Sequence, residues 1–449
     1  MDVKLIARAA GALLACSAAD HASASDIVIE NATIIDGAGS PPHAGRHILI
    51  TDDRIVFVED EPVKAAPGAI RIDATGKFLI PGLIDTHVHL RGAADSAASP
   101  PRRQNRREAE QALASYLYAG VTTIYDAGND PDFIFELRAD EQSGRILSPR
   151  IFATGGIVTY PGSHGSSPYA THVESWPAAA PGVEAHAARK PDMVKFTLEE
   201  RGWGARPLIP MLPVDLLQRL VEFFNDRGIR TTVHASSELR AREAIFAGVD
   251  TLAHPVIQGP VSDNFVRLMA VKKVPMSSTL TIGESYSRLA ENPNFLDQPL
   301  YQAALSSREI EKLKTETRKE FQERSWTWWM KIMTPIAQEN LRKIHEAGGV
   351  IALGTDQTIG PAVHREMELL AGAGIAPIDV IKIATHNAAR FLGVEDQIGL
   401  VAPGMKADLV LLGADPSINI DNAKAIELVI KNGAVIDRRR LPVAGTIEP

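Results

Sequence analysis

The sequence predicts an α/β protein in which a (β/α)8 barrel stands beside a smaller β-rich unit. Three observations predict this fold class: the chain has 449 residues, its middle alternates strand and helix patterns, and its two ends share one β-rich texture. A chain of this length usually forms one barrel-sized core and a second, smaller core.

The barrel is expected over residues 81–399. Short apolar runs alternate there with amphipathic helical segments, which is the pattern of parallel strands covered by helices. Each run ends at small, proline or polar residues, so eight strands can be counted. The candidate strands are residues 78–80, 121–125, 150–153, 193–196, 231–234, 251–254, 275–278 and 350–354.

The smaller unit is expected from residues 25–80 and 400–449 together. Both segments contain short β-branched runs that turn residues separate, a pattern of strands joined by tight turns. Because the same texture lies on both sides of the barrel segment, we expect one composite β-domain. Its strand-like runs are residues 26–29, 33–35, 47–50, 54–58, 407–412 and 426–433.

Two connections within the barrel segment are unusually long. Residues 155–191 are rich in Gly, Ser and Pro and carry His164, whereas residues 283–345 are charged and helical in pattern. Connections of such length in a compact domain are usually lids or insertions with a function. Trp326, Trp328 and Trp329, within the second, are expected to pack in a helical core.

Residues 1–24 have the pattern of an export signal. Lys4 and Arg8 precede a small-residue apolar run of about 11 residues, too short for the roughly 20 that span a bilayer. Ala22-Ser23-Ala24 then forms a cleavage pattern. We therefore expect a periplasmic or secreted protein; a lipid anchor on Cys16, the single cysteine, is the alternative. Either way, cysteine is excluded as a metal ligand of the mature protein.

The charge balance excludes some partners. The formal net charge is -8, and acidic and basic residues are interspersed, so no basic stripe is available to neutralise nucleic-acid phosphates. No stretch of the chain has transmembrane length, so no membrane span is expected. A small molecule is the expected partner, and the protein is expected to form a homo-oligomer.

Polar side chains at the ends of predicted strands indicate a metal site. The carboxyl ends of barrel strands meet at one face, where catalytic groups of such barrels lie. Imidazoles and carboxylates are standard zinc ligands. A single histidine on an apolar strand is usually a hydrogen-bonded core residue, but a whole set at strand ends predicts a shared purpose. The set comprises His87, His89, Lys195, His234, His254 and Asp356.

Several motifs resemble those of the amidohydrolase superfamily. Residues 80–89, Ile-Pro-Gly-Leu-Ile-Asp-Thr-His-Val-His, look like its P-G-x-I-D-x-H-x-H signature. Residues 384–390 through Gly399, together with residues 403–409, resemble its closing segment. Residues 248–254 and 278–280 are similar to the imidazolonepropionase-like branch, which includes Xaa-Pro and Xaa-Arg dipeptidases with a carboxylated lysine. The resemblance implies a distorted (β/α)8 TIM barrel beside a composite β-sandwich.

The resemblance also implies roles for the predicted site residues. His87, His89 and Asp356 would hold one divalent cation, expected to be zinc, and His234 and His254 a second. Lys195 would react with carbon dioxide to form a carbamate that bridges the two. A hydroxide shared by the cations would attack a carbonyl carbon while Asp356 transfers the proton. His164 matches a loop histidine that contacts the substrate oxygen in this branch, although a plain polar loop residue is an equal alternative.

The preferred reaction is hydrolysis of a small amide, such as a dipeptide, an N-acyl amino acid or an aromatic amide. A mononuclear deaminase or cyclic-amide hydrolase is an alternative. However, deaminases of the superfamily carry a glutamate three residues after the strand-five histidine, and Ser237 stands there. An ester, lactone or carbamate hydrolase with the same site is a further alternative, because the attacking hydroxide serves any activated carbonyl. A binding protein without activity is disfavoured by the intact ligand set.

Overall fold

The computed structural model describes residues 26–90, 105–201 and 208–445. The predicted export signal at residues 1–24, with Cys16, lies outside the described residues. Within the described ranges, no helix combines the length and the apolar character needed to cross a bilayer.

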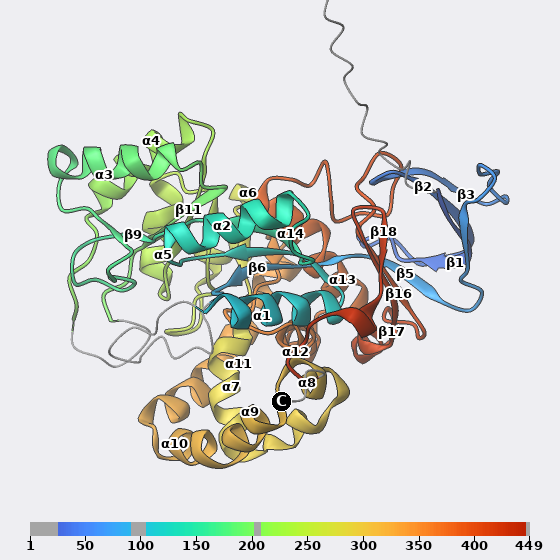
Figure 1. The fold of residues 1–449 in the computed structure, drawn as a ribbon. Coiled ribbons are helices and arrows are strands. Elements are labelled where there is room, and N and C mark those ends of the chain that lie inside the picture. The colour runs from blue at the N-terminus through green and yellow to red at the C-terminus, as the bar shows by residue number, and fades with distance from the viewer. Residues whose placement is uncertain (1–25, 91–104, 202–207, 446–449) are drawn as a thin grey trace, which may run out of the picture.

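Eight parallel strands form the core of the barrel, which lies between the end strands and the green helices in Figure 1. Their hydrogen bonds divide into a three-stranded sheet, β6-β7-β8, and a seven-stranded sheet that runs from β10 through β9 and β11 to β15. Backbone hydrogen bonds join the two sheets, among them Asp192 to Ala153 (3.0 Å) and Thr86 to Leu353 (2.9 Å). The predicted distorted barrel is therefore confirmed. Its strands are β6 (Leu83–Val88), β7 (Val121–Asp126), β8 (Arg150–Ala153), β11 (Met193–Thr197), β12 (Arg230–His234), β13 (Thr251–Leu252), β14 (Met276–Ser277) and β15 (Ile351–Ala352).

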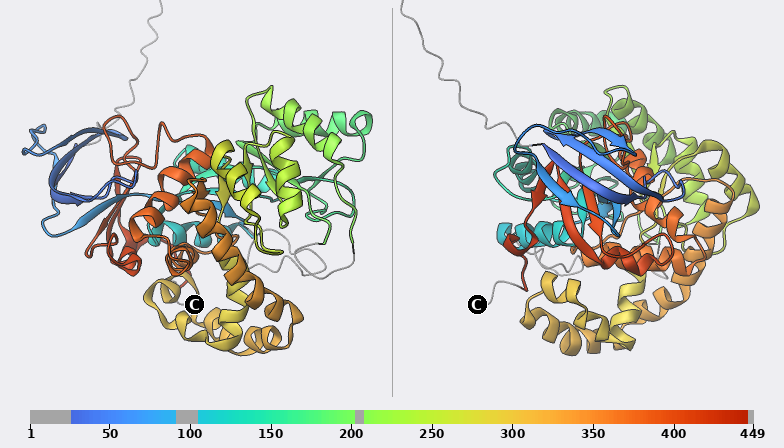
Figure 2. Two further views of the ribbon diagram at one scale, coloured as in Figure 1. Left: turned by 180° about the vertical axis from the view of Figure 1, so that it is seen from behind. Right: turned by 90° about the vertical axis from the view of Figure 1, so that its right-hand side faces the viewer.

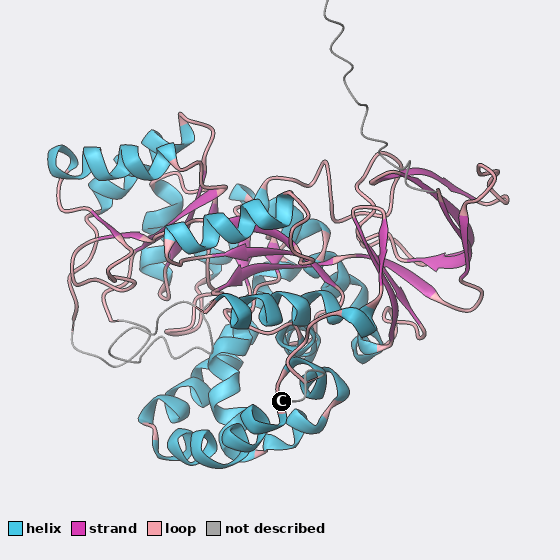
Figure 3. Cartoon of the chain, in the orientation of Figure 1, coloured by secondary structure: helices cyan, strands magenta, loops and turns pink. Residues whose placement is uncertain are grey.

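Helices cover the outside of these strands (Figure 3). Each buries one apolar stripe; α4, for example, buries Leu217, Leu220 and Phe224 at the spacing of one helical face. The covering helices are α1 (Arg106–Tyr118), α2 (Pro131–Gln142), α3 (Trp176–Ala188), α4 (Val214–Asn225), α5 (Glu238–Phe246), α6 (Asp263–Lys272), α12 (Pro361–Gly372), α13 (Pro377–Ala384) and α14 (His386–Leu392).

Both long connections carry structure of their own. The first contains β9 (Val158–Thr159) and β10 (Thr171–His172), and β9 extends the barrel sheet by pairing with β11. The second forms a helical lobe below the barrel in Figure 1. The lobe comprises α7 (Leu280–Glu291), η1 (Pro293–Asp297), α8 (Pro299–Ala304), α9 (Ser307–Lys312), η2 (Leu313–Thr317), α10 (Arg318–Glu323) and α11 (Ser325–Glu346).

The tryptophans of α11 divide between core and surface. Trp326 and Trp329 pack against the core as predicted. Trp328 is 62% exposed, so its predicted burial was wrong. Adjacent positions on a helix point about 100° apart, so Trp328 lies about 200° around the helix from Trp326 and cannot share its buried stripe.

The two chain ends form one mixed sheet, here called the end sheet, beside the barrel (Figure 2). Its strand order is β18-β17-β16-β5-β1-β2-β3, with β4 paired to β1. Aliphatic side chains such as Ile29, Ile48, Leu79 and Leu409 form its core. The strands are β1 (Ile27–Ile34), β2 (His43–Thr51), β3 (Arg54–Glu59), β4 (Ile70–Asp73), β5 (Phe78–Pro81), β16 (Leu409–Leu412), β17 (Ile426–Lys431) and β18 (Ala434–Ile436), with short η3 (Ile420–Lys424) and η4 (Arg438–Arg440).

One predicted barrel strand belongs to the end sheet instead. Residues 78–80 lie in β5, which pairs with β1 and β16, and the first barrel strand is β6. The apolar run continues from residue 78 to 88, so hydrophobicity alone does not show the division. Pro81-Gly82 makes it: a Cβ on Gly82 would lie 2.1 Å from the Thr122 hydroxyl, so only glycine allows the chain to pass there into the barrel.

Candidate metal centre

The predicted ligands lie together at the carboxyl ends of the barrel strands. His87 is the second-last residue of β6, and His89 is the first residue after that strand. His234 is the last residue of β12. Lys195 lies in the middle of β11, while His254 and Asp356 follow the short strands β13 and β15. Because all these strands are parallel, their ends converge on one face although the residues are up to 269 positions apart (356 − 87).

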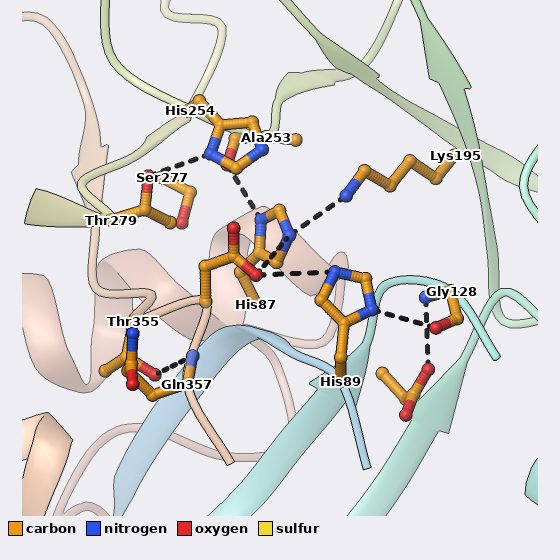
Figure 4. A network of polar contacts seen from close by, with 12 residues as sticks. His87, His89, Gly128, Lys195, Ala253, His254, Ser277, Thr279, Thr355 and Gln357 are labelled. Carbon is orange, nitrogen blue, oxygen red and sulfur yellow. Dashed lines mark hydrogen bonds and ion pairs between the residues drawn. The ribbon is translucent and has the colours of Figure 1, made fainter. Parts of the chain in front are cut away.

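Four histidine rings form a continuous row. Ring centroids are 5.3 Å apart for His89 and His87, 4.4 Å for His87 and His254, and 4.5 Å for His254 and His234. The Lys195 Nζ atom lies 2.9 Å from His87 Nε2 (Figure 4). All predicted histidine ligands and the lysine therefore share one site.

Asp356 closes the site beside His89. Its Oδ1 lies 3.4 Å from His89 Nε2 and 3.8 Å from His87 Nε2. Ligand atoms of His87, His254 and Asp356 all lie within 4.8 Å of one another, a group that could hold a metal ion. His87 and Asp356 were predicted as ligands of the first cation and His254 as a ligand of the second. Because their ligand atoms lie this close together, the two predicted ligand sets are neighbours in the structure.

Outer hydrogen bonds orient three of the rings for metal binding. His87 Nδ1 lies 2.9 Å from the Ala253 carbonyl, and His89 Nδ1 lies 2.8 Å from the Gly128 carbonyl. Since a carbonyl only accepts, each Nδ1 carries the proton and each Nε2 keeps a lone pair directed into the site. His254 Nδ1 likewise meets the Thr279 hydroxyl at 2.9 Å (Figure 4). The donor set and its orientation fit a divalent cation.

Burial keeps these imidazoles neutral. It lowers the pKa of His87 well below 6.5, and the positive charge of Lys195 adds to the effect. Burial also lowers the pKa of His254 well below 6.5, with His87 contributing next. A neutral imidazole is the ligand form, so binding a cation at neutral pH requires no loss of a proton from either ring.

Two residues hold ligands through an uncommon backbone conformation. Asp356 has φ 52° and Thr279 has φ 28°, where non-glycine residues are rare and β-branched ones rarer still. The Asp356 amide donates to the His87 carbonyl at 2.7 Å, and the Thr279 amide donates to the Gly354 carbonyl at 3.0 Å. Such conformations persist where the surroundings over-determine them, which is common at functional sites.

Asp85 ties the first strand to the loop that carries Asp356. Its carboxyl accepts from the Thr355 hydroxyl at 2.6 Å, from the Thr355 amide at 3.0 Å and from the His87 amide at 3.1 Å. The aspartate of the motif at residues 80–89 therefore has a positioning role that the motif alone does not reveal.

The structure also brings His164 to the site. Its ring stacks on that of His234, with 4.1 Å between centroids and 23° between planes. The hydroxyls of Thr159 and Thr197 both donate to the His164 carbonyl, at 3.0 and 2.9 Å, and so fix the loop. A loop histidine held in this way can face a substrate bound between the loop and the metal ligands.

The sequence prediction missed one acidic residue of the site, Glu199. It lies two residues past the end of β11, is 1% exposed, and places Oε2 3.5 Å from His234 Nε2. The period of two along an extended chain offers a signal for it, since Lys195, Thr197 and Glu199 occupy alternate positions. Extending that alternation beyond the strand would have put Glu199 on the face of Lys195.

Ser237 and Glu238, which follow His234 along the chain, make their contacts at the start of α5 and toward α6. Ser237 caps α5 by accepting from the Arg240 amide. Glu238 is turned toward α6, where its carboxylate accepts from Arg242 at 2.8 Å and from the Ser262 amide at 2.7 Å. The position where deaminases of the superfamily carry their glutamate is thus a helix cap here.

The sequence pattern that defines the amidohydrolase family matches residues 78–436. The chain belongs to the amidohydrolase family. It is 25% identical over 424 residues to a 5-methylthioadenosine/S-adenosylhomocysteine deaminase of Symbiobacterium thermophilum. The match covers 87% of this chain and 85% of that deaminase. It is 22% identical over 462 residues to an imidazolonepropionase of Phocaeicola vulgatus, covering 92% of this chain and 99% of the relative.

Among solved structures, the fold is similar to that of a prolidase complexed with N-methylphosphonate-L-proline. The TM-score is 0.75 at 22% identity, over 92% of this chain and 99% of that one. The predicted resemblance to imidazolonepropionases and Xaa-Pro dipeptidases is therefore confirmed at the level of family and fold. The family and the His87-His254-Asp356 group together identify a metal-dependent amidohydrolase, a hydrolase acting on carbon–nitrogen bonds.

Proposed function

We propose that the protein is an exported hydrolase that uses two divalent cations to cleave an amide bond of a small molecule. The observation that carries the proposal is the position of Lys195. Its side chain is 3% exposed, and its amine lies 2.9 Å from a histidine ligand atom, within a row of four imidazoles. A buried cationic amine among imidazoles is costly unless it serves the site. As a carbamate, the same side chain would instead carry one negative charge shared by two oxygens, which could bind two cations.

The ligand sets follow from the row of rings. His87, His89 and Asp356 would hold one cation, His234 and His254 the second, and carboxylated Lys195 would lie between them. Nitrogen and oxygen donors of this kind suit zinc. When bound, the cations supply Lewis-acid polarisation of the substrate carbonyl and bring the pKa of water to near neutrality.

The residues of this chain then handle the proton and the developing charge. The side chain of Asp356 is 16% exposed, whereas that of Glu199 is 2% exposed. Asp356 would take the proton of the attacking water and return it to the leaving nitrogen, as a general base and then a general acid. His164, stacked on His234, would donate to the oxygen on which negative charge develops.

An apolar or aromatic amide is proposed as the substrate in preference to a charged one, because apolar side chains occur in the segments that follow β9 and β11. After β11, the described chain resumes at Leu208, which is 71% exposed, and Met211 packs partly against the core. Tyr169, 38% exposed on the loop after β9, adds an aromatic side chain. Dipeptides, N-acyl amino acids and aromatic amides remain the substrate classes to compare.

A deaminase is the second candidate, because a deaminase matches 87% of this chain. The helix cap at Ser237 disfavours it, since no glutamate follows His234 at the expected spacing. The two functions differ in their product: a deaminase releases ammonia from an amino-substituted ring, and the proposed hydrolase releases a carboxylic acid.

A hydrolysis screen with the zinc-loaded enzyme tests the proposal. The panel contains dipeptides, N-acyl amino acids, aromatic amides, lactones and aminopurines, and the zinc content per chain is measured in parallel. We expect amide hydrolysis and two zinc ions per chain. Ammonia release from aminopurines with amides untouched would establish the deaminase, and lactones cleaved in preference would establish an ester-type hydrolase. Export is tested by N-terminal sequencing of the protein from the periplasm, which should begin after Ala24; an intact Met1 in the cytoplasm would refute it.

A further inference from the structure

The row of histidines carries a carboxylate at each end. At one end, Asp356 Oδ1 lies 3.4 Å from His89 Nε2. At the other end, Glu199 Oε2 lies 3.5 Å from His234 Nε2. The two pairs come from different strands, β6 with the loop after β15 in the first case and β12 with the end of β11 in the second. The site therefore has the same donor types at both ends.

The spacing in both pairs fits two donors on one cation. Ligand atoms at about 2.0–2.1 Å from a tetrahedral ion lie roughly 3.4 Å from each other. A direct hydrogen bond between imidazole and carboxylate would normally be shorter, at about 2.7–2.9 Å. The distances of 3.4 and 3.5 Å match two neighbouring ligand atoms of one cation.

Bonds to Glu199 hold its carboxylate in this orientation. Oε1 accepts from the Arg201 amide at 2.9 Å and from Gln258 Nε2 at 3.4 Å. Oε2 accepts from the Ser236 hydroxyl and faces His234. Partners of this kind, which orient a donor and reinforce its charge, commonly surround ligands to metals.

Glu199 is as deeply buried as the histidines beside it, with 1% of the residue exposed. A buried carboxylate is normally paired, hydrogen-bonded or bound to a metal. The ring of His234 and the space of the candidate metal centre lie on the side of its Oε2 atom.

We infer that Glu199 is a ligand of the second cation, in the role that Asp356 has for the first. The inference rests on the proposed binuclear function. Each cation would then have two imidazoles and one carboxylate: His87, His89 and Asp356 for the first, and His234, His254 and Glu199 for the second. Carboxylated Lys195 would be the ligand that both cations share. The extra carboxylate makes the second site as rich in negative charge as the first.

The test is a zinc titration of the full chain after removal of metal by a chelator. Glu199→Gln keeps the shape of the side chain but removes its charge. The matched control is Glu200→Gln, because Glu200 is the neighbouring acid and is paired with Arg240 on α5. Stoichiometry is read by elemental analysis, and affinity by competition with a chromophoric chelator.

We expect two zinc ions in the wild type and in Glu200→Gln. In Glu199→Gln, one ion should remain tight and the second should weaken by more than about 100-fold, since even an outer partner of a ligand is worth about 10–100-fold. Glu199→Asp, which retains the charge, should recover part of the second affinity. It also serves as the test variant if thermal melting of the metal-free proteins shows that Glu199→Gln does not fold.

Each other outcome contradicts a defined statement. Two tightly bound ions in both Glu199 variants, with affinities as in the wild type, would overturn the ligand role of Glu199 and leave the binuclear proposal standing. One ion in the wild type would overturn the binuclear proposal, and with it the second cation that Glu199 is inferred to hold.

Discussion

Two buried lysines, one in the barrel and one in the end sheet, show how differently the two regions use charge. Lys431 in β17 is 7% exposed and forms an ion pair with Glu141 of α2, so it joins the end sheet to the barrel. Lys195 in β11 is 3% exposed and faces His87 Nε2 among neutral imidazoles. The first is paired with an acid of a neighbouring helix. The second lies against a histidine of the candidate metal centre.

The surroundings of the two lysines extend this difference. The end sheet has a core of isoleucine, leucine and valine, which is what stability requires. The carboxyl ends of the barrel strands bury histidines, a lysine and carboxylates instead, although buried polar groups seldom contribute to stability. A region that buries such groups together is organised for chemistry.

The largest expected effect is on Lys195. Lys195→Ala should lower kcat/KM by at least about 10²–10³-fold, because a charged group in a water-poor site is worth that much or more. It should also reduce zinc from two ions to one. Steady-state kinetics and elemental analysis check both. Small carboxylic acids added to the variant should restore part of the activity by occupying the space of the lost carbamate.

Lys431→Met is the matched variant in the end sheet. Removing one partner of a buried pair costs about 3–5 kcal/mol of stability, so its melting temperature should fall while kcat/KM below that temperature stays unchanged.

Full activity with two metals in Lys195→Ala would remove the carbamate from the mechanism and erase the contrast between the two lysines.

The next effect concerns stability alone. Leu79 in β5 is fully buried in the apolar core of the end sheet, and that core contains none of the candidate metal ligands. Leu79→Ala should cost about 2–5 kcal/mol, since it removes buried methyl groups and leaves a cavity. Thermal melting measures the loss, and kinetics at a temperature where the variant is folded should match the wild type. A loss of kcat there would mean that the end sheet shapes the site.

The smallest effect distinguishes a structural histidine from the metal-binding ones. His364 in α12 is buried, and its Nε2 lies 2.9 Å from the Ala119 carbonyl. Burial lowers its pKa from 6.5 to about 4. Between pH 6.5 and pH 4 the unfolded chain therefore binds a proton at this residue that the folded chain does not. The free energy of unfolding must therefore fall as the pH drops through this window, by about 2 kcal/mol between pH 7 and pH 5.

His364→Gln should flatten that dependence. The comparison is the difference in melting temperature between pH 7 and pH 5, for wild type and variant, each free of metal. An equal slope in both proteins would show that His364 does not carry the effect. Zinc should leave the His364 contribution unchanged, whereas it should add a separate pH dependence through the site histidines, whose metal-binding form is neutral.

Much of the barrel and of its ligand positions could be predicted because local signals coincide with them. Apolar runs predict buried strands, and a histidine at the end of such a run is directed to the site by the parallel arrangement of the strands. The prediction of the first strand was wrong where no local signal changes: the apolar run continues through Pro81-Gly82, and the switch from one sheet to the other depends on the approach of Thr122 to Gly82.

What the sequence alone determined was the family, the fold class and the set of six candidate ligands, because each depends on a residue type at a recognisable place along the chain. Only the tertiary structure decided which residues accompany them. Thr279 meets His254, Asp85 holds the loop of Asp356, and Glu199 faces His234. These contacts join segments from separate strands, and their distances depend on how the barrel closes, so no local pattern encodes them.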